Sequence, residues 1–227
     1  MVVHMWMSKN PVTVPPATSI TDAAIRMARG RLRHLLVAEQ RPHRPPLLLG
    51  IVSAHDVARA FPPDLNPFSL EILERPIDRT VADIMARNMV TVGPGTPIEE
   101  AARLLRTHKI GALPVVDATG LAGIITESDC LAALGEIVGG DAGGVRVTFD
   151  VSHDDVTVPA VMTLASRHGL RLASVLTMAH DDRRLCVVRL AGPRTQAFID
   201  ALWASHHVVL SVEGSPVPPA NSSAFAG

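Results

Sequence analysis

A long pattern of residue types occurs twice in this 227-residue chain, and the repetition limits the possible folds more than any single motif does. Residues 50–56 read Gly-Ile-Val-Ser-Ala-His-Asp, and residues 123–129 read Gly-Ile-Ile-Thr-Glu-Ser-Asp. Each copy has a glycine, β-branched residues typical of a short buried strand, and a hydroxyl residue followed three positions later by aspartate. Each copy therefore predicts a strand that leads directly into the start of a helix.

The hydroxyl residue and the aspartate allow two interpretations. Their spacing is that of a capping box, in which the hydroxyl accepts a hydrogen bond from a helix amide and the acid accepts one from the preceding backbone. The start of a helix also offers free amides and the positive end of the helix dipole to an anion. A single copy favours the cap alone, whereas the repetition keeps a ligand site open as well.

The repeat extends well beyond this motif. At a shift of 78 residues, 18–24 aligns with 96–102 and 35–39 aligns with 113–117. The shift then falls to 73, because the first copy has five extra residues in the proline-rich segment 41–46, where an insertion is tolerated. Each copy predicts the order strand, helix, strand, strand, helix.

The C-terminal third follows a different pattern. It predicts the order βαββαβ, which is the ferredoxin-like arrangement. Its elements are expected at 145–151, 159–168, 170–178, 184–190, 192–204 and 207–212. The predicted fold class is α+β, a mixed α/β chain with two repeats and one further domain.

Composition and spacing exclude several classes of protein. The formal net charge is −1 and aromatic residues make up 3% of the chain, so we expect no nucleic-acid surface. No apolar run is long enough to cross a membrane, and the first residues lack the features of a secretory signal, so a cytoplasmic location is expected. Cys130 and Cys186 have neither zinc-site nor thioredoxin spacing.

Metal binding and catalysis are not expected either. The histidine-containing turns at 153–155 and 180–182, and the two histidines at 206–207, lack the spacing of a closed zinc site. The sequence contains no nucleophile motif and no phosphate-binding loop. We therefore expect neither an enzyme nor a required cofactor.

The two repeats resemble a pair of CBS domains, the tandem known as a Bateman module. The resemblance is carried by residues 81–85, 110–117 and 123–129 of the second copy, whereas the first copy has Leu36 in place of the usual proline and a longer hairpin. The C-terminal pattern resembles an ACT domain, with Ala160 where that family has a glycine near its first helix. A CBS pair followed by an ACT domain is the arrangement of the acetoin-utilisation (AcuB-like) CBS/ACT family.

The repeat boundaries and these resemblances predict six segments. They are a first CBS repeat at 1–61, a linker at 62–80, a second CBS repeat at 81–136, a joint at 137–144, an ACT-like domain at 145–213 and a tail at 214–227. The joint is predicted to be flexible from its glycines, and the tail is predicted to be disordered from its proline, serine and alanine content.

The resemblance to CBS pairs also implies ligand-binding residues. Such pairs bind adenine nucleotides or relatives such as S-adenosylmethionine in two clefts where their halves meet. The family pattern implies that Asp56 and Asp129 bind ribose hydroxyls, and that Ser53 and Thr126 bind phosphate.

Each cleft is expected to borrow residues from the opposite repeat. Arg33 and His34 should face the Asp129 cleft, whereas Gly111 and Ala112 should face the other cleft. Because Arg33 offers a guanidinium that can hold phosphate oxygens, a phosphorylated ligand is predicted to bind first beside Asp129. The other cleft is then expected to be weaker or suited to an uncharged ligand. Arg33 equally fits a solvated helix end, where cations are favoured.

These resemblances imply a non-catalytic regulatory protein that senses AMP, ADP, ATP or S-adenosylmethionine through its CBS pair. The ACT-like domain is expected to hold a homodimer, and the regulated partner is expected to be another protein. Two alternatives remain open. One is a structural dimerisation or scaffold module with degenerate pockets, and the other is an amino-acid sensor that uses the ACT-like domain.

Overall fold

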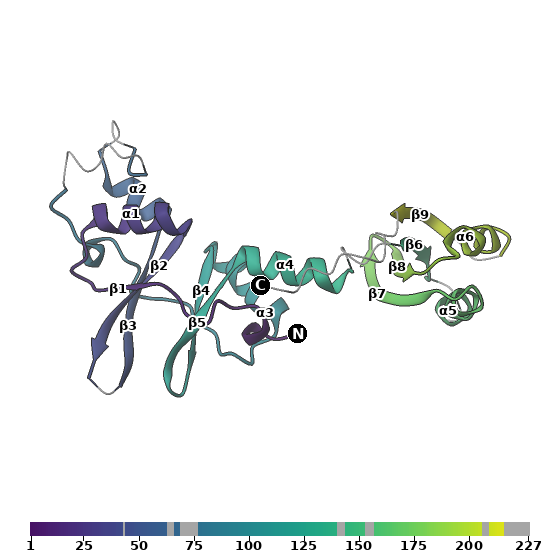
Figure 1. Cartoon of the computed structure of the whole chain (residues 1–227), viewed down its shortest axis with the longest axis horizontal. Helices are drawn as coiled ribbons and strands as arrows, with labels where there is room; N and C mark the ends of the chain where they lie inside the picture. Colours follow the sequence, from purple (N-terminus) through teal and green to yellow (C-terminus); the bar gives the residue numbers. More distant parts are fainter. Residues whose placement is uncertain are drawn as a thin grey trace. The chain divides into compact units, whose positions relative to one another are not determined.

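A computed structural model describes residues 1–42, 44–62, 66–68, 77–139, 144–152, 157–205 and 209–215 of the chain (Figure 1). Contacts between residues divide the chain into two compact units, Met1–Leu131 and Ala132–Gly227. The first unit contains both copies of the repeated motif, and the second contains the C-terminal pattern. Parts of the predicted linker, joint and tail, and the histidines at 153 and 206–207, lie outside the described residues.

The first repeat forms a three-stranded sheet with two helices. Its elements are β1 (Thr13–Val14), α1 (Ile20–Gly30), β2 (His34–Arg41), β3 (Arg44–Ser53) and α2 (Ala54–Ala60). β1 lies parallel to β2, with Val14 opposite Val37, and β2 lies antiparallel to β3, with His34 opposite Ser53. The order strand, helix, strand, strand, helix predicted for this repeat is confirmed.

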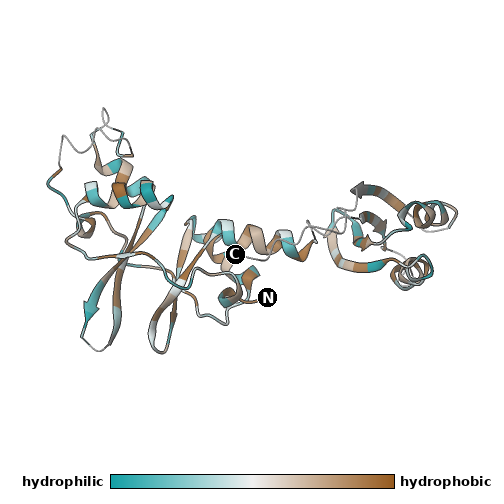
Figure 2. Ribbon diagram, in the orientation of Figure 1, coloured by the Kyte–Doolittle hydropathy of each residue, from teal (hydrophilic) through white to brown (hydrophobic). Residues whose placement is uncertain are grey.

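The second repeat follows the same plan with a shorter first strand. Its elements are α3 (Ile98–His108), β4 (Ala112–Asp117), β5 (Gly120–Thr126) and α4 (Glu127–Ile137). The first strand is reduced to one parallel bridge between Val92 and Val115, which are the counterparts of Val14 and Val37. Polar residues lie near the tip of the β2–β3 hairpin, whereas the strands themselves are mostly apolar (Figure 2).

Equivalent positions of the two repeats form the core of the first unit. Ile20, Met27 and Leu35 are at most 1% exposed, and so are their counterparts 78 residues later. Those counterparts are Ile98, Leu105 and Leu113. The helices bury one apolar stripe against the strands, as the helical spacing of these residues predicts.

The short segments that begin each repeat pack on the opposite repeat. These segments are η1 (Val3–Met5) and η3 (Val81–Asp83), each with the few residues that follow it. After η1, the amide of Ser8 donates to the carbonyl of Ile124 at 2.9 Å in the second repeat. After η3, the carbonyl of Ala86 accepts from the amide of Ile51 at 3.1 Å in the first repeat. The repeats are therefore interlocked and cannot separate without breaking backbone pairs.

The glycine that begins each repeated motif is required by this crossing. A Cβ atom on Gly123 would lie 2.7 Å from the carbonyl oxygen of Ser8. A Cβ atom on Gly50 would lie 2.6 Å from the sulfur of Met85 and 3.0 Å from the carbonyl oxygen of Ala86. The crossing segment occupies the space that a side chain would need.

Both repeats end their first helix at a basic residue in the left-handed conformation. Arg31 has φ 50° after α1, and Lys109 has φ 53° after α3. Helices often end in this conformation, but glycine is the usual residue there. Helix α3 ends at His108, and at Lys109 the chain turns toward β4.

The second unit is a four-stranded antiparallel sheet with two helices. Its elements are β6 (Gly144–Asp150), α5 (Thr157–Arg167), β7 (Arg171–His180), β8 (Arg183–Ala191), α6 (Thr195–Trp203) and β9 (Val209–Ser215). The strands lie in the order β7-β8-β6-β9. The predicted order βαββαβ is confirmed, and the strand order is the one in which the first and third strands of such a unit are central.

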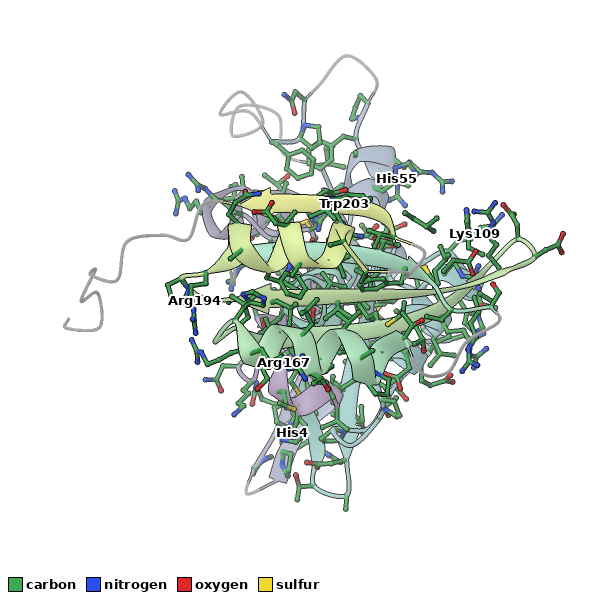
Figure 3. The ribbon with its side chains drawn as sticks, turned by 90° about the vertical axis from the view of Figure 1, so that its right-hand side faces the viewer. His4, His55, Lys109, Arg167, Arg194 and Trp203 are labelled. Carbon is green, nitrogen blue, oxygen red and sulfur yellow. The ribbon has the colours of Figure 1, made fainter. Side chains whose placement is uncertain are left out.

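Helices α5 and α6 cover one face of this sheet (Figure 1). Phe149 on β6, Val161 on α5 and Phe198 on α6 are fully buried in the shared core. Arg194, which precedes α6, donates from Nε to the carbonyl of His168 at 3.0 Å, just after α5 (Figure 3). This hydrogen bond ties the starting residue of one helix to the end of the other.

Candidate functional site

The repeated hydroxyl and aspartate residues form equivalent capping boxes in both repeats. Oδ2 of Asp56 accepts from the amide and the hydroxyl of Ser53 at 2.9 and 2.6 Å. Oδ2 of Asp129 accepts from the amide and the hydroxyl of Thr126 at 2.8 and 2.7 Å. Both hydroxyl oxygens accept in turn from the aspartate amide, at 3.2 and 3.3 Å. The cap predicted from the spacing is therefore present.

The capping bonds decide which atoms remain available to a ligand. The hydroxyl hydrogen of Ser53 is donated to Asp56, and that of Thr126 is donated to Asp129. Neither hydroxyl can donate to a phosphate without breaking its capping bond. The four hydrogen bonds found to the carboxylates of Asp56 and Asp129 all end on Oδ2, so Oδ1 of each aspartate remains as an acceptor for a ligand hydroxyl.

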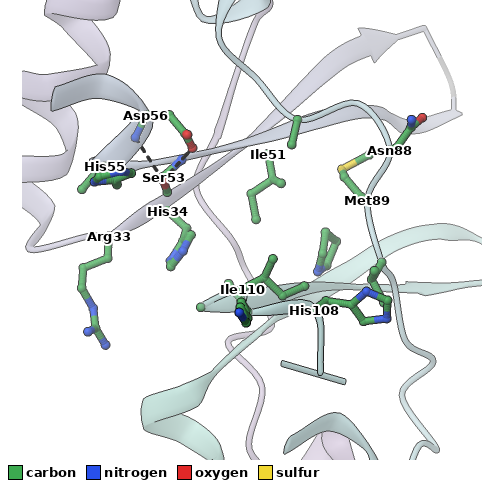
Figure 4. A pocket seen from close by; sticks show the side chains of 17 residues that line it. Arg33, His34, Ile51, Ser53, His55, Asp56, Asn88, Met89, His108 and Ile110 are labelled. Carbon is green, nitrogen blue, oxygen red and sulfur yellow. Dashed lines mark hydrogen bonds between the residues drawn. The ribbon is translucent and has the colours of Figure 1, made fainter. Parts of the chain in front are cut away.

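A cavity of about 710 Å³ lies in the first unit beside Ser53 and Asp56 (Figure 4). Its walls come from residues 53–56 at the start of α2, residues 88–90 between η3 and α3, and residues 108–112 at the end of α3 and the start of β4. The volume falls within the usual range for small-molecule sites, about 300–1,000 Å³. The expectation that Ser53 and Asp56 share a cleft with Gly111 and Ala112 agrees with this lining.

Arg33 and His34, which were expected to face the Asp129 cleft, also line this cavity. The carbonyl of Arg33 accepts from the amide of Ala54 at 2.8 Å, so the backbone of β2 holds both residues next to Ser53. The guanidinium of Arg33 nevertheless reaches the opposite repeat, where Nη2 donates to Oγ of Ser128 at 2.7 Å. Arg33 therefore lies between the two motifs.

Thr126 and Asp129 do not line this cavity. Their backbone is tied to β4 instead, because Thr126 pairs with Ala112 and the amide of Glu127 donates to the carbonyl of Gly111 at 3.2 Å. Each motif is thus paired with the strand of its own repeat, as the predicted hairpins imply. The contact of Arg33 with Ser128 is one in which a side chain reaches the opposite repeat, as was expected of each cleft.

The charged residues that line the cavity are mainly basic. Arg33 and Lys109 are permanent cations, and Asp56 is the carboxylate among the lining residues. Histidines at positions 34, 55 and 108 complete the polar lining. Sequence reasoning missed His108 and Lys109, although Lys109 aligns with Arg31 in the repeat and directly precedes the motif at 110–117.

His34 occupies the centre of this site, between Ser53 and Ile110 in Figure 4. A Cβ atom on Gly111 would lie 2.9 Å from its Cε1 atom, so the absence of a side chain at position 111 makes room for the imidazole. Burial of the ring, and then the nearby charge of Arg33, lower the pKa of His34. Asp56 and Glu127 oppose this effect without reversing it.

The lowered pKa of His34 predicts a loss of stability in acid. Below the ordinary histidine value of 6.5, the unfolded chain binds a proton at this position before the folded chain does, so the free energy of unfolding falls as the pH drops. We expect His34→Gln to remove part of this loss when urea unfolding is compared at pH 7 and pH 5. An equal loss in the parent and the variant would contradict the prediction.

Three other features were checked among the described residues: groups of metal ligands, the two cysteine thiols and membrane-spanning helices. The described residues contain no group of three potential metal ligands. Burial raises the pKa of the Cys130 and Cys186 thiols, which disfavours the reactive thiolate. Among the described parts of the chain, no helix is both long and apolar enough to span a membrane.

The fold and the cavity define a module of two interlocked repeats with a ligand-sized pocket between them. The CBS domain model matches residues 2–63 and 81–136, and the chain belongs to the CBS domain family. A CBS domain-containing protein of Dictyostelium discoideum is 33% identical over 136 residues, which are 58% of this chain and 89% of that protein. The CBS domain-containing protein YhcV of Bacillus subtilis is 35% identical over 109 residues, which are 48% of this chain and 72% of that protein.

An enzyme and two solved structures are each similar to somewhat more than half of this chain. Inosine-5′-monophosphate dehydrogenase of Nitrosopumilus maritimus is 31% identical over 54% of this chain, which corresponds to 22% of that enzyme. A CBS domain pair crystallised with 5′-methylthioadenosine and S-adenosyl-L-methionine is 26% identical, with a TM-score of 0.48 over 60% of this chain and 96% of that one. A Vibrio cholerae protein assigned to acetoin utilisation (AcuB) is 28% identical, with a TM-score of 0.47 over 59% and 90%.

Proposed function

We propose that this chain is a non-catalytic regulatory protein whose CBS pair binds an adenosyl nucleotide in the cavity beside Asp56. The observation that carries the proposal is the carboxylate of Asp56. Its Oδ2 atom is held by two capping bonds, which fix the side chain, while Oδ1 remains as an acceptor. A fixed carboxylate of this kind can accept hydrogen bonds from the vicinal hydroxyls of a ribose.

The apolar part of the lining suits a purine ring. Ile51, Met89 and Ile110 line the cavity near its polar residues. Small-molecule sites are usually apolar, with a few polar groups that fix orientation. We assign the base to this apolar wall, the ribose to Asp56, and the remaining ligand groups to the basic residues. By the symmetry of the repeats, Thr126 and Asp129 are proposed to serve a second site in the same way.

A regulatory role requires the ligand to favour one state of the protein over another. The cavity is walled by both repeats, so a ligand there would change how the two repeats pack together. We propose that a second protein binds one of these two packing states in preference to the other.

Calorimetry with AMP, ADP, ATP, adenosine and S-adenosylmethionine tests this proposal. Binding of one or more of these ligands, with a matching rise in the melting temperature, is the expected result. No heat of binding and an unchanged melting temperature at millimolar ligand would instead favour the structural scaffold.

We also propose that the second unit acts as an ACT-like dimerisation domain, with β7 as the contact. β7 is an outer strand of its sheet, and no charged residue or proline lies between Arg171 and His180. Edge strands usually carry such residues because they prevent pairing with another chain. Antiparallel pairing with a second copy would bring Arg171 of one protomer near Asp181 of its partner, so the end charges are complementary.

Val175→Lys is expected to abolish this dimer. Val175 lies in the middle of β7 and is 40% exposed, and two copies of the lysine would repel each other across the paired strands. Leu47→Lys is a matched control, because Leu47 is 41% exposed but lies in the first unit. Sedimentation equilibrium at micromolar concentration should give a dimer for the parent and the control, and a monomer for Val175→Lys. A dimeric Val175→Lys protein would move the contact away from β7.

A further inference from the structure

We propose that the cavity beside Asp56 selects its ligand by charge, and that Lys109 and Arg33 make it prefer a phosphorylated adenosyl nucleotide over a neutral or sulfonium-bearing one. This inference rests on the proposed binding of an adenosyl ligand in that cavity. It goes further because it names the class of ligand and the residues that choose it.

The first step is the balance of charge at the cavity wall. Arg33 and Lys109 take part in none of the ion pairs found among the described residues. The partner found for the guanidinium of Arg33 is the hydroxyl of Ser128, which is neutral. Asp56 is the opposing carboxylate among the lining residues. Among the residues that line the cavity, two permanent cations therefore stand against one carboxylate.

The second step concerns hydrogen-bond donors. A phosphate needs N–H or O–H donors, and the hydroxyl of Ser53 is already committed to Asp56. Arg33 has five N–H groups, of which the bond to Ser128 uses one. The ammonium of Lys109 adds three more donors. These two side chains, and not the hydroxyl of the repeated motif, are the donors available to a phosphate.

The third step is the fixed position of Lys109. Its amide donates to the carbonyls of Leu105 and Arg106, and its backbone is held in the left-handed conformation at the end of α3. The side chain therefore starts from a defined point beside the cavity. A cation at this place also suits the negative end of the helix dipole, which is a purely structural reason for a basic residue.

Arg31 provides a control that distinguishes stabilisation of the helix end from phosphate binding. It occupies the equivalent position after α1, with the same conformation and the equivalent backbone bonds, but it does not line the cavity. Arg31→Gln and Lys109→Gln should therefore cost similar stability if the dipole is the reason for both residues. Only Lys109→Gln should change which ligands bind.

The test is calorimetry of the full chain with ATP, AMP, adenosine and S-adenosylmethionine at low ionic strength, with EDTA and without phosphate buffer. The expected order of affinity is ATP, then AMP, then adenosine, with S-adenosylmethionine weakest. Lys109→Gln should weaken ATP about tenfold and leave adenosine unchanged, because a charge-assisted hydrogen bond is lost. Arg33→Gln should act in the same direction, and added salt should weaken ATP more than adenosine.

Other outcomes bear on different parts of the argument. Equal affinities for ATP and adenosine, or tighter binding of S-adenosylmethionine, would overturn charge selection while leaving the proposed function in place. If Arg31→Gln weakens ATP binding as much as Lys109→Gln does, Lys109 has no particular role in the choice of ligand. If none of the four ligands binds, the proposed function itself fails, and this inference fails with it.

Discussion

Replacing Gly123 with alanine is expected to destabilise the first unit by about 1–3 kcal/mol, the usual cost of forcing extra atoms into a packed site. The new methyl carbon would lie 2.7 Å from the carbonyl oxygen of Ser8. That oxygen accepts from the amide of Ile124 at 3.1 Å, so the crossing backbone cannot withdraw without losing the bond. Gly50→Ala should act in the same way against the carbonyl of Ala86.

Tryptophan fluorescence during urea unfolding can measure this loss in the first unit. The chain has two tryptophans, and Trp203→Phe leaves Trp6 as a reporter of the first unit. Trp203 is 58% exposed, so its replacement should be mild. Gly95→Ala is the matched control, because its new Cβ would have no atom within 4 Å. Equal midpoints for Gly95→Ala and Gly123→Ala would show that the crossing does not require glycine.

The order of elements could be predicted because it depends on local patterns. Ile20, Met27 and Leu35 recur as Ile98, Leu105 and Leu113, and both sets are buried because helical spacing and strand composition place them on the inner faces. The capping boxes were also predictable, since they join residues only three positions apart.

The packing of the η1 and η3 segments on the opposite repeats could not be predicted from the repeat itself. Residues 3–7 match residues 81–85 in sequence, so each lead-in could pack equally well on its own repeat or on the other one. The choice depends on contacts between residues far apart in the chain, such as Ser8 with Ile124. Because the two segments have the same pattern, the pattern cannot tell which repeat each segment packs against.

The positions of the basic side chains at the cavity also depend on contacts between the two repeats. The family pattern assigned Arg33 to one cleft, but a long side chain at the meeting point of two repeats can serve both. The turn at Lys109 could not be predicted, because a basic residue in the left-handed conformation has no sequence signal comparable to glycine. We propose the phosphate site in the cavity beside Asp56, whereas the family pattern predicts it beside Asp129.

Asp56→Ala is accordingly expected to weaken adenosyl-ligand binding by about 10- to 100-fold, the value of hydrogen bonds to a charged acceptor. The change also removes the acceptor that caps α2, so a loss of about 1 kcal/mol in stability should accompany it. Calorimetry measures the affinity, and urea unfolding measures the stability of the same variant.

Asp83→Ala separates the two effects. Asp83 caps η3 with bonds of 2.8 and 2.9 Å from the amide and hydroxyl of Thr80, which match those of Asp56, but it does not line the cavity. It should lose comparable stability and keep full affinity for the ligand. Asp129→Ala should weaken binding less than Asp56→Ala does, because the described cavity lies beside Asp56. If Asp129→Ala has the larger effect, the main site lies at the second motif and the ranking derived from the family pattern is restored.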